Sequence, residues 1–166
     1  MATQTPQTSI LLLGAGELGS AFLPHLSILP STAITLGVRS PAKYTHLTTT
    51  YASLTLSPID LNSNFHILAQ TFSYYDVLIS ATGFGADPST VLKLCSEVLE
   101  AGKIRKEQGK GRLWFFPWQW GVNYDITGDG AGLMPLFGAQ APSAIYFARK
   151  RPLVTLRGQS CQQAYS

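Results

Sequence analysis

The chain carries a glycine-rich turn directly after a short apolar segment, and few folds accommodate that combination. Residues 10–13, Ile-Leu-Leu-Leu, have the pattern of a strand buried on both faces of a parallel sheet. They lead into Gly14-Ala15-Gly16-Glu17-Leu18-Gly19, and a helical pattern follows. Gly14 permits a tight turn, Gly16 leaves room for a pyrophosphate, and Gly19 allows the helix to pack closely on the strand. The spacing therefore predicts a dinucleotide-binding unit, the alternative being a glycine-rich turn that binds no ligand.

The phosphates of such a ligand would face the free N–H groups and the positive end of the helix dipole. We therefore expect cofactor contacts from the turn and the first helical residues, Gly14, Gly16, Glu17, Leu18 and Gly19. We expect this helix to place five residues on one side, namely Leu18, Ala21, Phe22, His25 and Leu26. Pro24 should kink or shorten it.

Apolar runs and helical stripes alternate along the rest of the chain. Further strands are expected at residues 33–38, 54–56, 75–81 and 113–116, with a short one at 153–156. A helix should begin at Asp87-Pro88-Ser89 and end near Gly102, and a further crossover should lie at residues 62–73. Alternation of this kind predicts a Rossmann-type, doubly wound parallel α/β sheet with helices on both faces. We expect residues 8–140 to form an NAD(P)-binding Rossmann domain and residues 141–166 a divergent basic tail.

The end of the second strand indicates which dinucleotide is bound. An NAD-preferring site carries an acidic residue there, about 20 residues beyond the glycine-rich turn, to bind the ribose 2′-hydroxyl. This chain has Arg39 at that place, and no acidic residue lies between Glu17 and Asp60. Arg39 can pair with a 2′-phosphate, and Ser40 and Lys43 add a donor and a charge. The sequence therefore predicts NADP(H), the alternative being an exposed arginine that merely ends a strand.

Two later loops are expected on the same side of the sheet. Thr82, Gly83 and Phe84 follow the fourth strand, where ligands bind in open α/β sheets, and are expected beside the adenosine ribose. An ordinary strand-to-helix turn is the alternative. Trp118 and Trp120 follow the fifth strand and would form an apolar wall for the nicotinamide or an aromatic substrate, or else pack inside the domain.

Composition excludes several classes of function. Charged residues make up 13% of the chain and the net charge is +3, without the basic stripe of a nucleic-acid-binding protein. The cationic run at residues 103–112 is read as a solvated loop or, alternatively, an anion-binding patch. The two cysteines and three histidines lack metal-ligand spacing, and Cys95 is expected in the core.

No run of residues is long and apolar enough for a membrane span, and the start does not resemble a signal peptide. We therefore expect a cytoplasmic protein with a small-molecule substrate. Sparse surface charge is also compatible with a protein partner or a homo-oligomer.

Tyr146 and Lys150 have the spacing with which a lysine lowers the pKa of a proton-donating tyrosine. Seven tyrosines in the chain make a chance match plausible, and the preceding strand ends in Phe-Phe-Pro without a catalytic serine. We assign no catalytic residue.

Four segments resemble a known family: residues 14–19, Val38-Arg39, residues 76–83 and Trp114-Phe115-Phe116-Pro117-Trp118-Gln119-Trp120-Gly121-Val122-Asn123-Tyr124-Asp125. Over residues 8–140 the chain resembles the NmrA-like, isoflavone-reductase-like proteins, an atypical branch of the short-chain dehydrogenases. The last segment is similar to their fungal aromatic-alcohol-reductase-like group. The resemblance implies NADPH-dependent reduction of an aromatic or polyketide-like small molecule, often in secondary metabolism.

The chain departs from this family in three ways. Members are much longer, so the resemblance implies a C-terminally truncated protein that lacks the second, substrate-binding part. The isoflavone-reductase branch uses a lysine on the helix after the Phe-Phe-Pro strand, whereas residues 136–140 offer none and Gln140 stands near that place. Residues 141–166 no longer resemble the family. An NADPH-dependent reductase, impaired by truncation or not, is therefore weighed against a non-catalytic NADP(H) sensor and a remnant that binds nothing.

Overall fold

The structure is a computed structural model that describes residues 7–83 and 89–117 and the backbone of 154–156. Its strands are β1 (Thr8–Leu13), β2 (Thr32–Val38), β3 (Leu54–Pro58), β4 (Val77–Ser80), β5 (Leu113–Phe116) and β6 (Val154–Leu156). They form one parallel sheet in the order β3-β2-β1-β4-β5-β6, which is the strand order of a Rossmann-type sheet. The predicted fold class is therefore confirmed, and every expected strand is present.

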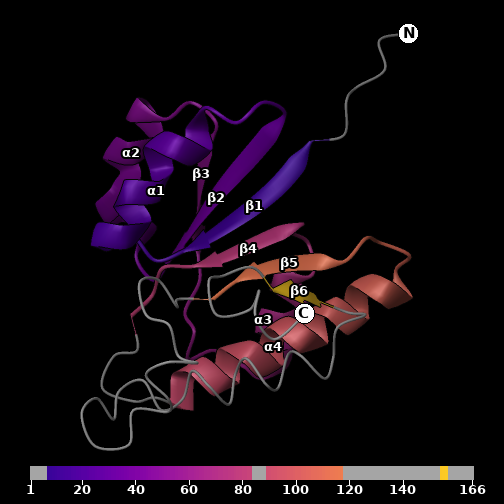
Figure 1. Cartoon of the computed structure of the whole chain (residues 1–166). Coiled ribbons are helices and arrows are strands. Elements are labelled where there is room, and N and C mark those ends of the chain that lie inside the picture. Colours follow the sequence, from indigo (N-terminus) through magenta and orange to yellow (C-terminus); the bar gives the residue numbers. More distant parts are fainter. Residues whose placement is uncertain (1–6, 84–88, 118–153, 157–166) are drawn as a thin grey trace, which may run out of the picture.

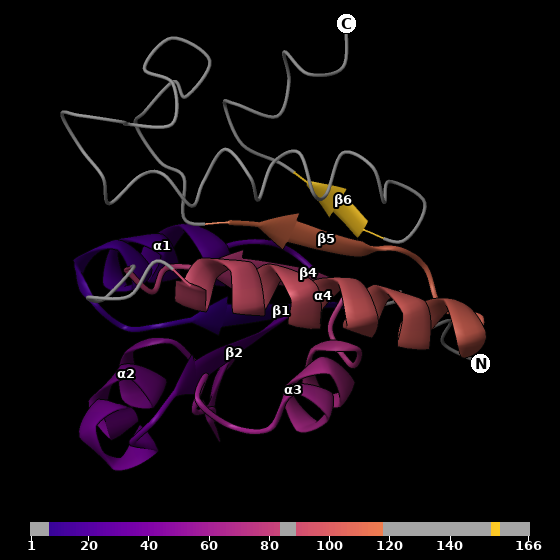
Figure 2. The same cartoon turned by 90° about the horizontal axis from the view of Figure 1, so that it is seen from below.

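Helices cover both faces of this sheet (Figure 1). They are α1 (Glu17–Ser27), the 3₁₀ turn η1 (Pro41–Tyr44), α2 (Thr45–Thr50), α3 (Phe65–Phe72) and α4 (Ser89–Glu107). Figure 2 shows α4 running along the sheet beside β5. The crossover expected at residues 62–73 is α3, whereas η1 and α2 were not predicted. None of the helices in the described ranges is long and apolar enough to cross a membrane.

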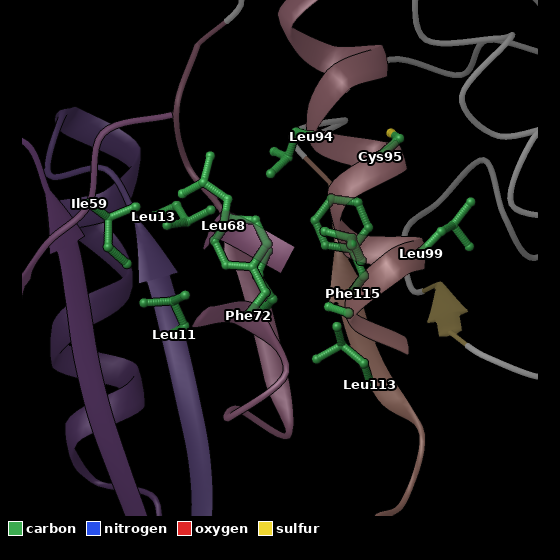
Figure 3. Packing of buried hydrophobic residues seen from close by; sticks show 13 residues of the cluster. Leu11, Leu13, Ile59, Leu68, Phe72, Leu94, Cys95, Leu99, Leu113 and Phe115 are labelled. Carbon is green, nitrogen blue, oxygen red and sulfur yellow. The ribbon is translucent and has the colours of Figure 1, made fainter. Parts of the chain in front are cut away.

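Strand β1 supplies both halves of the core because its side chains alternate between the two faces. Leu11 and Leu13, both fully buried, join the cluster under α3 and α4 (Figure 3). Ile10 and Leu12 join the cluster on the other face, against α1 and α2. Burying a leucine side chain contributes roughly 1.5–3 kcal/mol, so this continuous apolar run stabilises the sheet from both sides.

Helix α1 buries a different set of residues from the one predicted. Leu18, Phe22 and Leu26 do pack on the core, but the fully buried side chain is Leu23, and Ala21 and His25 are exposed. The helix continues for one turn after Pro24 and ends at Ser27. Its buried face is therefore rotated from the predicted stripe.

Helix α4 extends beyond the predicted end at Gly102. Gly102 is buried inside the helix, which continues to Glu107. Packing against the core outweighs the roughly 1 kcal/mol that a glycine costs within a helix. The chain leaves the helix only near Gly109, which has a positive φ of 68°. Lys103, Arg105 and Lys106 consequently lie on the helix, so the prediction of a solvated loop is wrong for these residues, whereas residues 108–112 do lie outside the helix and are exposed.

Strand β6 pairs with β5 in parallel, although it lies beyond residue 140. The domain boundary at that residue stays a prediction.

Candidate functional site

A cavity of about 470 Å³ opens where the carboxyl ends of the strands meet. Strands β1 and β4 are neighbours there, while the chain continues from them to opposite sides of the sheet. Ligands of open α/β sheets bind at such a switch point. The walls come from the segments that follow β1, β2, β3 and β4, from the first two turns of α4 and from the carboxyl end of β5. They include Gly14, Ala15, Arg39, Ser40, Lys43, Ile59, Asp60, Leu61, Asn62, Thr82, Gly83, Thr90, Val91 and Leu94.

The glycine-rich turn after β1 forms one edge of the cavity. Gly14 has a φ of +93°, and a Cβ there would lie 3.0 Å from Thr82 Cγ2 and 3.1 Å from the Ala81 oxygen. A Cβ on Gly19 would lie 2.1 Å from the Gly14 oxygen, so α1 can approach the turn this closely only with glycine at 19. A Cβ on Gly16 would meet nothing within 4 Å. The protein therefore leaves no room for a side chain at Gly14 and Gly19, whereas the space around the Gly16 α-carbon is empty.

Helix α1 begins beside this open position. Gly16 is its N-cap residue, and no side chain caps the helix. Glu17 is exposed in the first turn, and Leu18 packs on the core. Gly16, Glu17, Leu18 and Gly19 do not line the cavity itself, so any contact they make with a ligand would come from the helix start.

Three predicted residues after β2 lie together at another edge. Arg39, Ser40 and Lys43 all line the cavity, and all three are exposed. The strand register brings Leu13 beside Gly37, so Arg39 follows close to the glycine-rich turn. Within the described ranges no hydrogen bond or ion pair involves the Arg39 guanidinium or the Lys43 ammonium. Two unpaired cations therefore stand at the cavity edge.

The loop after β4 forms part of the cavity wall. Thr82 and Gly83 line it, and the Thr82 hydroxyl lies 3.2 Å from the Ser80 hydroxyl. A Cβ on Gly83 would meet nothing within 4 Å. Phe84 lies outside the described residues, as do Trp118, Trp120, Gln140, Tyr146 and Lys150.

The structure adds residues to the cavity that were not predicted as site residues. Asp60 and Asn62 come from the loop after β3. The backbone N–H of Asn62 donates to Asp60 Oδ1 at 3.0 Å. Asp60 was visible in the sequence only as the first acidic residue after Glu17. Its place in the cavity depends on the pairing of β3 with β2, which periodicity alone does not give.

An ion pair with a buried carboxylate lies behind this wall. Lys93 Nζ is 2.5 Å from Glu97 Oε1, and the Glu97 side chain is 1% exposed. Burial raises the pKa of Glu97 above its ordinary value, although the bond and charge of Lys93 oppose the shift. The spacing of four residues fits an ion pair on a helix, but burial was not evident from the sequence.

A second network lies at the amino ends of β1 and β4, away from the cavity. The Arg105 guanidinium, 4% exposed, is 2.8 Å from Asp76 Oδ1, and Asp76 also accepts hydrogen bonds from Ser9. Burial alone would raise the pKa of Asp76, but the bonds from Ser9 and Arg105 outweigh it and hold the pKa below its usual value. This network is remote from the cavity lining and has a structural role. Among the described residues no cluster of His, Cys, Asp or Glu could hold a metal ion.

Comparison with known proteins shows what this chain is similar to. No family model matches the sequence. An NmrA-like family domain-containing oxidoreductase of Gibberella moniliformis is 35% identical over 134 residues, which covers 74% of this chain and 41% of the relative. The resemblance to the NmrA-like family is confirmed. The chain spans about two fifths of the length of this NmrA-like relative.

Solved structures share the fold. AtPrR2, solved with NADP+ and (+)-pinoresinol, aligns with a TM-score of 0.65 at 18% identity over 89% of this chain and 48% of its own. The oxidoreductase ylbE of Lactococcus lactis aligns with a TM-score of 0.59 at 18% identity, over 90% of this chain and 67% of its own. At these identities the likeness supports the Rossmann-type fold of the NmrA-like chain and nothing finer.

Proposed function

We propose that this chain binds NADP(H) in the cavity and forms the cofactor-binding part of an NmrA-like reductase. The pyrophosphate would lie at the start of α1, where the backbone N–H groups of Glu17, Leu18 and Gly19 point out of the first turn. No side chain caps this helix start, and the space around Gly16 is open, so a phosphate meets neither a competing acceptor nor a Cβ. Gly14 completes the turn beneath it.

The observation that carries the choice of NADP(H) is the group of Arg39, Ser40 and Lys43 at one edge of the cavity. Arg39 and Lys43 have no partner within the described ranges, and a phosphate on the ribose would supply one. NAD-preferring sites carry a carboxylate where Arg39 stands. Among the described residues that line the cavity, Asp60 carries a carboxylate, but it follows β3 and forms no ion pair with Arg39.

The remaining predicted residues complete the proposed site. Thr82 and Gly83 line the cavity on the β4 side, and the open space at Gly83 allows a ribose to pass close to the backbone. Phe84 is included in the proposed site from the sequence alone. These residues bind and orient the dinucleotide, and the NADPH itself supplies the hydride when bound.

We propose as substrate an aromatic or polyketide-like small molecule of secondary metabolism. The reductase interpretation is supported by the NmrA-like relative, which is an oxidoreductase. The substrate class is supported by AtPrR2, which shares the fold and was solved with pinoresinol. The segment from Trp114 to Asp125 is similar to the aromatic-alcohol-reductase-like group, and two residues at its start, Phe115 and Pro117, line the cavity.

A non-catalytic NADP(H) sensor is the second candidate, favoured by the absence of lysine from residues 136–140. A reductase consumes NADPH when aromatic aldehydes are added, whereas a sensor binds NADPH without turnover. The loss of NADPH absorbance in the presence of each aldehyde of a panel distinguishes the two.

The test of cofactor binding is a titration of the purified chain with NADPH and with NADH, followed by nicotinamide fluorescence. We expect NADPH to bind at least tenfold more tightly than NADH. Arg39→Asp should abolish this preference, because it replaces a cation that pairs with the 2′-phosphate by a carboxylate that repels it. Arg112→Asp is the matched control, since Arg112 is exposed and does not line the cavity. A folded chain that binds neither dinucleotide would overturn the proposal.

A further inference from the structure

The loop that joins β3 to α3 supplies one wall of the cavity through residues 59–62. The backbone N–H of Ile59 donates to the Val38 carbonyl of β2 at 3.0 Å, and from Asp60 onward the hydrogen bonds that the loop's own N–H groups and side chains make within the described residues are local. The amides of Asn62 and Ser63 donate to Asp60 Oδ1 and to the Asp60 carbonyl at 3.0 and 2.9 Å. The Asn64 side chain caps α3 by accepting from the His66 amide. These bonds shape the loop but do not fix it relative to the wall that α4 provides.

Lys93 joins the two walls. Its ammonium donates to the Leu61 carbonyl at 2.6 Å and to the Ser63 carbonyl at 3.4 Å. Lys93 stands on α4 between Thr90 and Val91 on one side and Leu94 on the other, and these three residues line the cavity. Figure 3 shows Leu94 projecting from α4 while Ile59 comes from the side of β1 and β2. One side chain therefore connects both walls outside the cavity itself.

Glu97 keeps Lys93 in this orientation. The Lys93 side chain is 38% exposed, so a lysine without a partner there would extend into solvent. Glu97 is almost completely buried one turn along α4 and accepts a hydrogen bond from Nζ at 2.5 Å. The ammonium thus has three acceptors, two of them carbonyls of the cavity loop.

We propose that Lys93 is a positioning residue that holds the loop of residues 60–63 in place for dinucleotide binding. The inference rests on the proposed function, since it assigns the loop to the NADP(H) site. The loop lies at the same cavity as Arg39 and Ser40. Releasing it would therefore weaken binding of the end of the cofactor that carries the 2′-phosphate, without removing any group that contacts the phosphate.

Four variants test this assignment. Lys93→Met removes the bonds to the loop but leaves Glu97 buried without its cation. Lys93→Met/Glu97→Gln removes the same bonds and leaves no buried charge. Glu97→Gln alone retains a hydrogen-bond acceptor for Lys93. Lys103→Met is the matched control, because Lys103 pairs with Glu100 on the same helix and does not line the cavity.

The first measurement needs no cofactor: amide hydrogen exchange at Asn62 and Ser63. We expect exchange about tenfold faster in both variants that lack Lys93, because local opening of the loop becomes easier, and no change in Lys103→Met. The second is NADPH titration, where the same two variants should bind about tenfold more weakly while Glu97→Gln stays near wild type. Thermal unfolding serves as the fold check, and the double variant should be at least as stable as Lys93→Met.

The outcomes separate the inference from the function it rests on. Faster loop exchange with weaker NADPH binding in the double variant supports Lys93 as a positioning residue. Wild-type NADPH affinity in a folded double variant overturns that role and leaves the cofactor proposal intact. Unchanged exchange at Asn62 and Ser63 overturns it as well, whatever the affinity. Wild-type protein that binds no NADPH overturns the proposed function itself.

Discussion

Gly16 and Gly19 stand three residues apart, yet the space around their α-carbons differs completely. A Cβ at 19 would lie 2.1 Å from the Gly14 oxygen, while a Cβ at 16 would meet nothing within 4 Å. Gly19→Ala should therefore destabilise the chain by roughly 2 kcal/mol or more, because backbone must move. Gly16→Ala should change stability by less than about 1 kcal/mol but weaken NADPH binding. Urea unfolding and NADPH titration of both variants check this, and equal destabilisation by the two would contradict it.

Glu97 gives the stability of the chain a specific pH dependence. Burial raises its pKa in the folded protein, so between the unfolded and folded pKa values the folded state binds more protons. The contribution of Glu97 to stability is therefore greatest at low pH and declines as the pH rises through the folded pKa. Relative to Glu97→Gln, the wild type should lose unfolding free energy from pH 4 toward pH 7. Urea unfolding at a series of pH values measures this difference, and a difference that grows with pH would refute it.

One buried side chain anchors the C-terminal turns of helix α4. Arg105 donates to the carbonyls of Gly111, Ser73 and Tyr75 at 2.8, 3.2 and 2.6 Å and pairs with Asp76. It thereby ties the helix end to the start of β4 and to the turn before β5.

Arg105→Met should cost about 3 kcal/mol, because several buried acceptors lose their donor. Arg112→Met, at an exposed arginine outside the network, should be close to neutral. Denaturant unfolding of both variants measures the costs, and similar values for the two would contradict a structural role for Arg105.

The same helix shows how far the sequence could be read. Cys95, which was expected in the core, is buried there together with Leu94, Val98 and Leu99 of the same helix. Its end was predicted wrongly, because Gly102 was taken as a stop and the cations after it as a solvated loop. Whether a helix continues past a glycine depends on tertiary packing, and so does the burial of Arg105 and Glu97. Arg105 contacts Ser73 and Asp76, 32 and 29 residues earlier in the chain, and the Lys93 partner of Glu97 contacts Leu61, 32 residues earlier. Periodicity contains no information on such contacts.

The residues of the candidate site also differ in how far the sequence predicts them. Residues in a local pattern, such as Gly14, Arg39 and Thr82, were found because their place follows from the strand before them. Asp60 and Lys93 depend on which strands pair and which helices pack together, so they emerged only from the structure.

At the scale of the whole chain, binding of NADPH should stabilise the folded state. A ligand at a hundredfold excess over its Kd adds about 2.7 kcal/mol to the unfolding free energy. For a protein of 166 residues this raises the thermal midpoint by roughly 5–10 °C. NADH at the same concentration should raise it less, and Arg39→Asp should remove the difference between the two. Calorimetry with each dinucleotide measures the shifts, and equal shifts in the wild type would argue against the 2′-phosphate contact.

The strand order also divides the chain into two continuous stretches that recombination can exchange. Strands β3, β2 and β1 come from one continuous stretch of the polypeptide, and β4, β5 and β6 from the next, with the cavity at the seam. A recombination event within residues 73–76 would exchange one stretch without interrupting a strand or helix. The descendant would inherit the glycine turn and Arg39 from one parent and Thr82 and α4 from the other. Preference for a phosphorylated ribose and the shape of the opposite wall would then evolve separately, provided that Lys93 still fits the loop of residues 60–63 and that Asp76 keeps its bonds to Ser9 and Arg105.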